Sequence, residues 1–184
     1  MRVRHADPVR DAAACMAIYG PYVADTAISF EETPPTAGRF ATHIAETTAR
    51  YPWLVLEDDG DVVGYAYAAQ HRPRAAYRWA VDVGIYVDPT RQRSGAGHAL
   101  YDALLELLRR QRLRSACAGI TLPNDASIGL HRAFGFEHVG TYRAIGWKAG
   151  GWRDVSWWQL DLAPDGDGDR DGAAPPEPLG PRRL

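Results

Sequence analysis

Two glycines separated by one residue, Gly95 and Gly97, lie between an apolar segment and a segment whose leucines have helical spacing. Glycine lets a backbone approach a ligand closely, because no side chain stands in the way. The first turn of the following helix presents unpaired N–H groups and the positive end of the helix dipole, and both attract phosphate. The spacing therefore indicates a phosphate-binding loop, and the alternative is a glycine-rich turn that binds nothing.

Known phosphate-binding loops differ in the residues that accompany the glycines. A P-loop needs a Lys directly after its last Gly, and the one Lys of this chain is Lys148. A dinucleotide-binding loop needs a third Gly where this chain has Leu100. The remaining pattern is Gln or Arg, two residues, Gly, one residue, then Gly or Ala. Gln92, Gly95 and Gly97 match it, and it resembles the pyrophosphate loop of the GNAT superfamily of N-acetyltransferases.

An acid interrupts the apolar segment before this loop at Asp82. A carboxylate in a buried strand needs a task, and one task is to take a proton from a substrate ammonium, directly or through water. The alternative is a structural acid at a strand edge, paired with Arg78 or Arg153.

Three further side chains could act on a substrate. His131 has an unperturbed pKa of about 6.5 and could serve as an acid or a base, although a His on a helix is often only packed or solvated. Arg72 and Arg74 lie in a polar connector before the apolar segment. Guanidinium groups bind carboxylate, phosphinate and sulfone oxygens bidentately, and the alternative is two solvated surface residues.

The elements that must position these residues alternate between strands and helices. Periodicity and turn residues predict helices over Asp7–Val23, Ala37–Arg50, His98–Arg112 and Ser127–Phe134, and a short extended stretch over Ile28–Glu31. They predict strands over Met1–His5, Trp53–Glu57, Val62–Ala69, Tyr77–Val87, Ser115–Thr121, His138–Trp147 and Val155–Leu162. We expect an α/β (α+β) fold, in which a mixed, mostly antiparallel central sheet is flanked by helices.

Length and composition favour one globular domain, residues 1–162, followed by a disordered acidic and Pro-rich tail, residues 163–184. With 46% apolar residues and a formal net charge of −2, the chain gives no indication of binding nucleic acid or a membrane. Cys15 and Cys117 fit no metal or redox spacing, so we expect buried thiols and no metal. No secretory signal follows Met1, which favours the cytoplasm.

A second segment strengthens the resemblance to acetyltransferases. Asn124–Phe136 resembles the second cofactor segment of the GNAT superfamily, with an Asn after a strand, a short helix and a Phe-Gly-Phe close. Shorter runs are similar to the phosphinothricin acetyltransferase family, which includes enzymes that acetylate methionine sulfoximine and methionine sulfone. These runs are Tyr51–Val55, Arg74–Trp79, Leu122–Asp125 and Gly150–Trp158.

This resemblance implies a GNAT fold and transfer of acetyl from acetyl-CoA to the α-amine of a small amino acid, by direct attack and without an acyl-enzyme. It implies a homodimer with active sites near the subunit interface. It places the pantetheine arm against the backbone of Ile85, Tyr86 and Val87 and against Asn124. It places the pyrophosphate against Arg93, Ser94, Gly95, Ala96, Gly97 and His98.

For catalysis the resemblance implies Asp82 as the base, where the family usually has Glu, and His131 where the wider superfamily often has a Tyr that protonates the thiolate. For the acceptor it implies Phe30, Arg72, Arg74 and Tyr77. Glu31 replaces an Arg of the phosphinothricin-specific members, which favours a sulfone or sulfoximine acceptor. Two rivals remain open: another amine acceptor, such as a protein N-terminus or an aminoglycoside, and a regulatory acetyl-CoA-binding module without catalysis.

Overall fold

Seven strands form one sheet in a computed structural model that describes residues 1–91, 94–163 and 175–181. The strand order is β1-β2-β3-β4-β5-β7-β6. Every neighbouring pair is antiparallel except β4 and β5, which are parallel. The expected mixed, mostly antiparallel sheet is thus confirmed. The strands are β1 (Arg2–His5), β2 (Trp53–Asp58), β3 (Asp61–Gln70), β4 (Ala80–Val87), β5 (Ser115–Thr121), β6 (Glu137–Lys148) and β7 (Gly151–Asp161).

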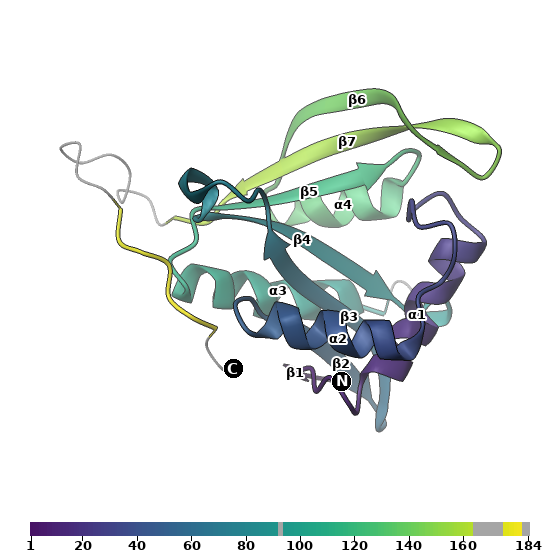
Figure 1. Cartoon of the computed structure of the whole chain (residues 1–184), viewed down its shortest axis with the longest axis horizontal. Coiled ribbons are helices and arrows are strands. Elements are labelled where there is room, and N and C mark those ends of the chain that lie inside the picture. The colour runs from purple at the N-terminus through teal and green to yellow at the C-terminus, as the bar shows by residue number, and fades with distance from the viewer. Residues whose placement is uncertain (92–93, 164–174, 182–184) are drawn as a thin grey trace.

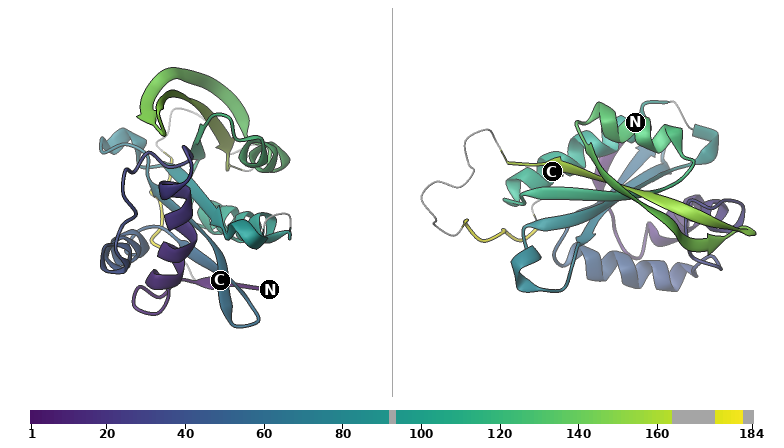
Figure 2. Two further views of the ribbon diagram at one scale, coloured as in Figure 1. Left: turned by 90° about the vertical axis from the view of Figure 1, so that its right-hand side faces the viewer. Right: turned by 90° about the horizontal axis from the view of Figure 1, so that it is seen from above.

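Helices cover both faces of this sheet (Figures 1 and 2). On one face lie α1 (Ala12–Ala24) and α2 (Ala37–Thr48), and on the other lie α3 (Ala96–Arg110) and α4 (Asp125–Ala133). The two faces have separate cores, one around the leucines of α3 and one around Cys15, Ile18 and Phe40 of α1 and α2.

Strand β2 shows why two helical layers are needed. Its side chains alternate between the faces, with Leu54 and Leu56 in the α3 core and Trp53 and Val55 in the α1–α2 core. All four are buried, so this strand reads as a continuous apolar run.

Strands β4 and β5 pair over only three positions, which opens the sheet. The register joins Ala80 to Ser115, Val81 to Ala116 and Asp82 to Cys117, and no residue of β4 after Asp82 pairs with a described residue of β5. From that point the two strands diverge along their length (Figure 1). Residues 83–87 of β4 therefore have one backbone edge that faces no strand among the described residues.

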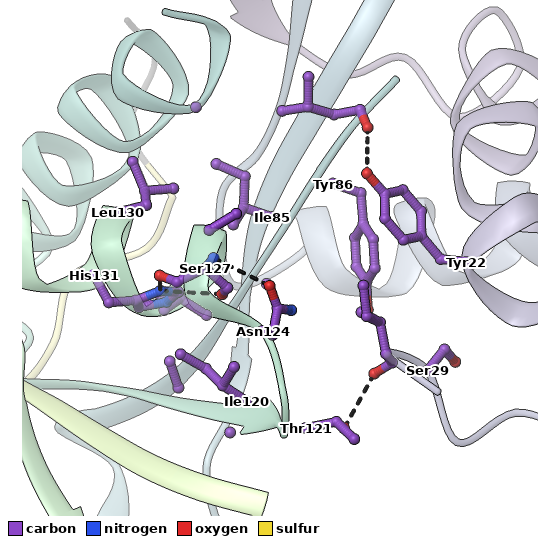
Figure 3. A pocket seen from close by; sticks show the side chains of 18 of the residues that line it. Tyr22, Ser29, Ile85, Tyr86, Ile120, Thr121, Asn124, Ser127, Leu130 and His131 are labelled. Carbon is purple, nitrogen blue, oxygen red and sulfur yellow. Dashed lines mark hydrogen bonds between the residues drawn. The ribbon is translucent and has the colours of Figure 1, made fainter. Parts of the chain in front are cut away.

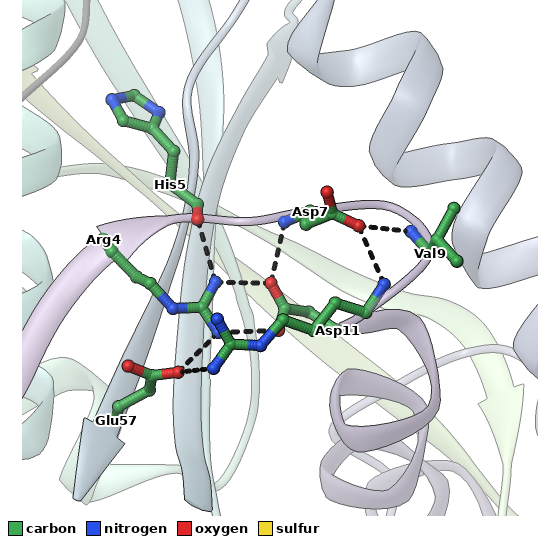
Figure 4. Close-up of polar contacts among 7 residues, drawn as sticks. Arg4, His5, Asp7, Val9, Asp11 and Glu57 are labelled. Carbon is green, nitrogen blue, oxygen red and sulfur yellow. Dashed lines mark hydrogen bonds and ion pairs between the residues drawn. The ribbon is translucent and has the colours of Figure 1, made fainter. Parts of the chain in front are cut away.

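Some element boundaries differ from the expected ones. Helix α1 begins at Ala12 and not at Asp7, because the Asp7 carboxylate accepts hydrogen bonds from the amides of Val9 and Arg10 and closes a turn there (Figure 4). Tyr77 ends the short 3-10 turn η1 (Ala75–Tyr77) and does not belong to β4. The stretch Ile28–Glu31 forms bends and not a strand.

The final residues that the structure describes, 175–181, lie against the domain. The amide of Leu179 donates to the Gln111 carbonyl, and Trp79 Nε1 donates to the Pro176 carbonyl. Glu177 accepts a bidentate contact from Arg78. Residues 175–181 thus have fixed partners, whereas the sequence led us to expect disorder over 163–184. No helix in the described ranges is long and apolar enough to span a bilayer.

Candidate active site

The opening between β4 and β5 is the floor of a cleft of about 1280 Å³ (Figure 3). Its walls come from the first turns of α3 and α4, the α1–α2 connection and β7. Fifteen of the sixteen predicted site residues lie in the part of the chain that the structure describes, and eleven of these line the cleft. Those that do are Phe30, Asp82, Ile85, Tyr86, Val87, Gly95, Ala96, Gly97, His98, Asn124 and His131.

The first turn of α3 presents backbone N–H groups to this cleft. Gly95 is the N-cap, with φ of 85°, a left-handed conformation that favours Gly over any residue with a Cβ. The first amide bonded within the helix is that of Ala99, which donates to the Gly95 carbonyl. The preceding amides, at residues 96–98, are left for a ligand, together with the positive end of the helix dipole.

Gly97 serves a different purpose from Gly95. A Cβ at position 97 would lie 3.2 Å from Leu130 Cδ2, so Gly allows α3 to pack closely on α4. Ser94 is exposed, and its hydroxyl donates to the Arg91 carbonyl at 2.6 Å. The expected contact of Arg93 lies outside the described residues.

Asn124 caps the second helix at the cleft. Its Oδ1 accepts from the Ser127 amide at 3.1 Å (Figure 3). The side-chain amide group Nδ2 carries no recorded hydrogen bond among the described residues, and it offers a donor to a ligand carbonyl.

The edge of β4 forms the opposite wall. Ile85 packs partly on the α3 core, and Tyr86 belongs to an aromatic cluster in which its ring lies 4.9 Å from Tyr19 and 5.3 Å from Tyr65. The Val87 carbonyl accepts from Tyr22 Oη at 2.6 Å (Figure 3). The Tyr22 contact therefore fixes one end of the edge that a pantetheine arm would follow.

Asp82 is the last residue of β4 that pairs with β5, so its carboxylate lies where the cleft begins. It contacts His71, with 2.6 Å between His71 Nδ1 and Asp82 Oδ1. Burial raises the pKa of Asp82 above its usual value, and the hydrogen bond and charge of His71 with the charge of Arg72 only partly offset this. Arg78 and Arg153, the expected structural partners, contact Glu177 and backbone carbonyls instead.

His71 was not among the residues that the sequence predicted for the site. The pairing of β3 with β4 would have indicated it, because Ala69 of β3 pairs with Asp82. His71 follows Ala69 by two positions, so its side chain points to the same face of the sheet. That signal requires knowing which strands pair, and the sequence alone does not specify the pairing.

Three possible metal ligands lie together around Asp82. Ligand atoms of His71, Asp82 and Cys117 all fall within 4.8 Å of one another. The two closest already form a 2.6 Å hydrogen bond, and the positive charge of Arg72 acts on both Asp82 and Cys117. The hydrogen bond between His71 and Asp82 therefore accounts for the closeness of these groups, and we assign no metal to them.

His131 lines the cleft but has no nitrogen to spare. It is 2% exposed, its Nδ1 lies 2.7 Å from the Ser127 carbonyl, and its Nε2 lies 2.8 Å from Tyr101 Oη. Burial lowers its pKa, and the Ser127 contact only partly offsets this. A neutral ring that donates from Nδ1 and accepts at Nε2 satisfies both contacts. This geometry gives His131 a packing role and provides no support for the expected proton transfer.

The expected acceptor residues divide into two groups. Phe30 lines the cleft and packs on Gly146, where a Cβ would overlap its ring. Arg72, Arg74 and Tyr77 are exposed on the connector and do not line the cleft. Tyr77 contacts the ring of His71, with 5.9 Å between the ring centroids.

Two aromatic side chains of the cleft were not predicted from the sequence. Tyr67 covers Gly84, where a Cβ would lie 2.7 Å from the Tyr67 ring, and Trp157 packs on Gly119 in the same way. Both rings line the cleft, as Asp82 does. Glycines in the middle of β4 and β5 are the sequence signal for such close packing.

Comparison with known proteins agrees with this geometry. Residues 7–157 match the family described as Acetyltransferase (GNAT) domain. The chain belongs to the GNAT acetyltransferase family. It is 40% identical over 171 residues to a phosphinothricin N-acetyltransferase of Streptomyces viridochromogenes, with 93% of this chain and 89% of the relative covered. It is 39% identical over 158 residues to an L-methionine sulfoximine/L-methionine sulfone acetyltransferase of Pseudomonas aeruginosa, with 85% and 92% covered.

A solved structure of a GNAT acetyltransferase with acetyl-CoA resembles this chain closely. The phosphinothricin acetyltransferase of Sinorhizobium meliloti in complex with acetyl-CoA superimposes with a TM-score of 0.86, at 34% identity over 95% of each chain. The GNAT fold expected from the sequence is thus confirmed, and acetyl-CoA is the co-substrate of this family.

Proposed function

We propose that this GNAT acetyltransferase transfers the acetyl group of acetyl-CoA to the α-amine of a small amino acid or analogue. The observation that carries the proposal is the position of Asp82. It lies where β4 and β5 separate, and it lines the same cleft as the first turn of α3. The relatives named for phosphinothricin and methionine sulfone supply the acceptor class.

The residues of the cleft have separate roles in this proposal. The amides of Ala96, Gly97 and His98 hold the pyrophosphate, and those of Ser94 and Gly95 border it. The backbone of Ile85, Tyr86 and Val87 and the amide group of Asn124 hold the pantetheine arm. This arrangement leaves the thioester near Asp82.

The reaction must remove two protons from the acceptor ammonium. Asp82 takes the first through a bridging water, because its side chain is one methylene shorter than Glu, and releases a free amine. The amine nitrogen attacks the carbonyl carbon of the thioester, and the electron pair of the C=O π bond moves to the oxygen. When the tetrahedral intermediate collapses, the C–S bond breaks and the second proton passes from nitrogen to the departing thiolate. The products are the N-acetyl amino acid and coenzyme A.

Acceptor recognition combines the cleft with the connector. Phe30 and Glu31 line the cleft, and Arg72 and Arg74 lie on the connector outside it. We infer that one guanidinium binds the acceptor α-carboxylate, with Tyr77 beside it. The negative charge of Glu31 repels a second anion, which favours methionine sulfone or sulfoximine over phosphinothricin.

We also infer a homodimer built on the β6–β7 hairpin. Its exposed side chains include Trp147 and Trp152, at 62% and 64% exposure, whose rings pack 5.5 Å apart. Ile145 is 55% exposed and lines the cleft as well, so this apolar surface continues into the active site. A second copy would cover it beside the acceptor site. Sedimentation of the wild type and of Trp152→Glu tests this, with a dimer and a monomer expected respectively.

Two measurements test the proposed function. Calorimetry should show that Gly95→Glu abolishes acetyl-CoA binding, because the new side chain is strained at this φ and brings a negative charge to the pyrophosphate. Thiol release with a panel of amino acids, aminoglycosides and N-terminal peptides should show turnover with a small amino acid. Turnover with another amine alone would support the rival acceptors, and binding without turnover would support a regulatory module.

A further inference from the structure

Among the described residues, the Asp82 carboxylate forms one side-chain hydrogen bond, and its partner comes from the β3–β4 connection. His71 Nδ1 lies 2.6 Å from Asp82 Oδ1, within the range of a charge-assisted hydrogen bond. The two side chains are 17% and 34% exposed, so the imidazole is the more buried of the pair. Asp82 lines the cleft and His71 does not. The imidazole thus lies behind the carboxylate as seen from the ligand.

Rings fix the imidazole from two further elements. Its centroid lies 5.9 Å from that of Tyr77 in η1 and 6.4 Å from that of Trp157 in β7. Both contacts are steeply inclined, at 64° and 81°, which is the edge-to-face arrangement that aromatic rings favour. His71 is therefore held in place by packing, independently of its bond to Asp82.

The remaining groups around Asp82 cannot replace this bond. The Cys117 thiol, across the β4–β5 register, has its pKa raised by burial and by the Asp82 charge, and no recorded hydrogen bond joins the two. Arg72 acts on Asp82 through its charge, while its guanidinium donates to the His71 carbonyl. Tyr67 also feels the Asp82 charge. Within the described ranges, His71 alone both contacts the carboxylate and has an N–H to donate.

We propose that His71 is a positioning residue for acetyl transfer, whose imidazole holds the Asp82 carboxylate at the opening of the cleft. The neutral ring donates from Nδ1 to Asp82, which fixes one carboxylate oxygen and leaves the other for the bridging water. This assignment rests on the proposed function, because His71 acts only through Asp82, the proposed base. Aspartate has a shorter side chain than glutamate, and a fixed orientation compensates for the lost reach.

Two variants at position 71 separate positioning from packing. His71→Leu keeps an apolar side chain but removes the donor, and His71→Asn keeps an N–H close to the Nδ1 position. We expect His71→Leu to lower kcat about tenfold, a part of the ~10²–10⁴ that a general base supplies, with KM for acetyl-CoA unchanged. Without the His71 bond the pKa of Asp82 rises, so the acid limb of the pH–rate profile moves to higher pH. His71→Asn should restore most of kcat.

The matched control is Cys117→Ala, which removes another neighbour of Asp82, one that forms no hydrogen bond with it among the described residues, and should leave the pH–rate profile in place. A double-mutant cycle then asks whether the effect passes through Asp82, since His71→Leu should cost little further activity in an Asp82→Asn background. An unmoved acid limb in His71→Leu, or an equal loss in that background, would overturn the proposal.

Nitrogen NMR of the His71 ring gives a readout that needs no turnover. The Nδ1–H tautomer is expected in the wild type and is expected to be lost in Asp82→Ala. A ring protonated only at Nε2 in the wild type would overturn the proposal. If no acceptor is turned over by the wild type, the proposed function fails, and the tautomer still decides whether His71 holds Asp82.

Discussion

Asp11 and Asp82 are both acids in the folded domain, and their surroundings differ in kind. Asp11 is 1% exposed and receives two hydrogen bonds from Arg4, at 2.6 and 2.7 Å (Figure 4). Burial acts to raise the pKa of Asp11, but the bonds from Arg4 and the Asp7 amide, with the charges of Arg4 and Arg10, leave it below its usual value. Burial raises the pKa of Asp82, and His71 does not reverse it.

The difference lies in the partner. The Arg4 guanidinium is always charged, and it also binds Glu57 at 2.7 Å, so the first strand, the start of α1 and β2 are tied together. His71 is a weaker partner that leaves Asp82 able to accept a proton. The first arrangement stabilises the fold, and the second is the one that we propose keeps a base available at the cleft.

The largest expected effect is on catalysis. Asp82→Ala should lower kcat/KM by about 10²–10⁴ at neutral pH, because the ammonium loses its proton acceptor. Its melting temperature should stay close to that of the wild type. Initial rates of thiol release and a thermal melt of the same preparation measure both. A variant that keeps wild-type rates would remove Asp82 from the mechanism.

The second prediction is a variant that loses stability and keeps its activity. Asp11→Asn should lower the free energy of unfolding by about 3 kcal/mol, because Arg4 keeps its charge in a buried position with one anionic partner fewer. The folded fraction should retain kcat. Urea unfolding followed by fluorescence measures the first quantity. A loss of kcat without a loss of stability would erase the contrast between the two acids.

The smallest expected effect concerns stability and pH. The lowered pKa of Asp11 means that its contribution is present above the pKa of the unfolded chain and is lost as pH falls through the folded value. The raised pKa of Asp82 acts the other way, since its ionised form costs stability at neutral pH. Asp82→Asn should therefore melt slightly higher than the wild type at neutral pH, and this gain should shrink as pH falls. Equal melting temperatures of the wild type and Asp82→Asn at every pH would contradict a raised pKa of Asp82 in the folded state.

The sequence predicts the fold well where local patterns suffice. The helices and strands fall near their expected positions, and the glycine loop precedes α3 as expected. The predicted start of α1 was wrong because Asp7 closes a turn. A short Asp side chain can cap a turn as readily as it can begin a helix.

The site was predictable only in part, because its key contact joins residues from different elements. Asp82 and the glycine loop follow from local sequence, but the bond to His71 depends on the β3–β4 register. His131 illustrates the converse, since a helical His beside a cofactor segment reads as catalytic until Tyr101 and Ser127 are seen to occupy both nitrogens. Long-range packing decides both cases.

The most direct test is the pH–rate profile of the wild type and Asp82→Ala with L-methionine sulfone and acetyl-CoA. A base that deprotonates the ammonium matters most where free amine is scarce. The deficit of Asp82→Ala should therefore be large at neutral pH and should shrink on the alkaline side of the acceptor's own pKa. A deficit that stays constant across the range, or no deficit at all, would contradict the role of Asp82 as the base.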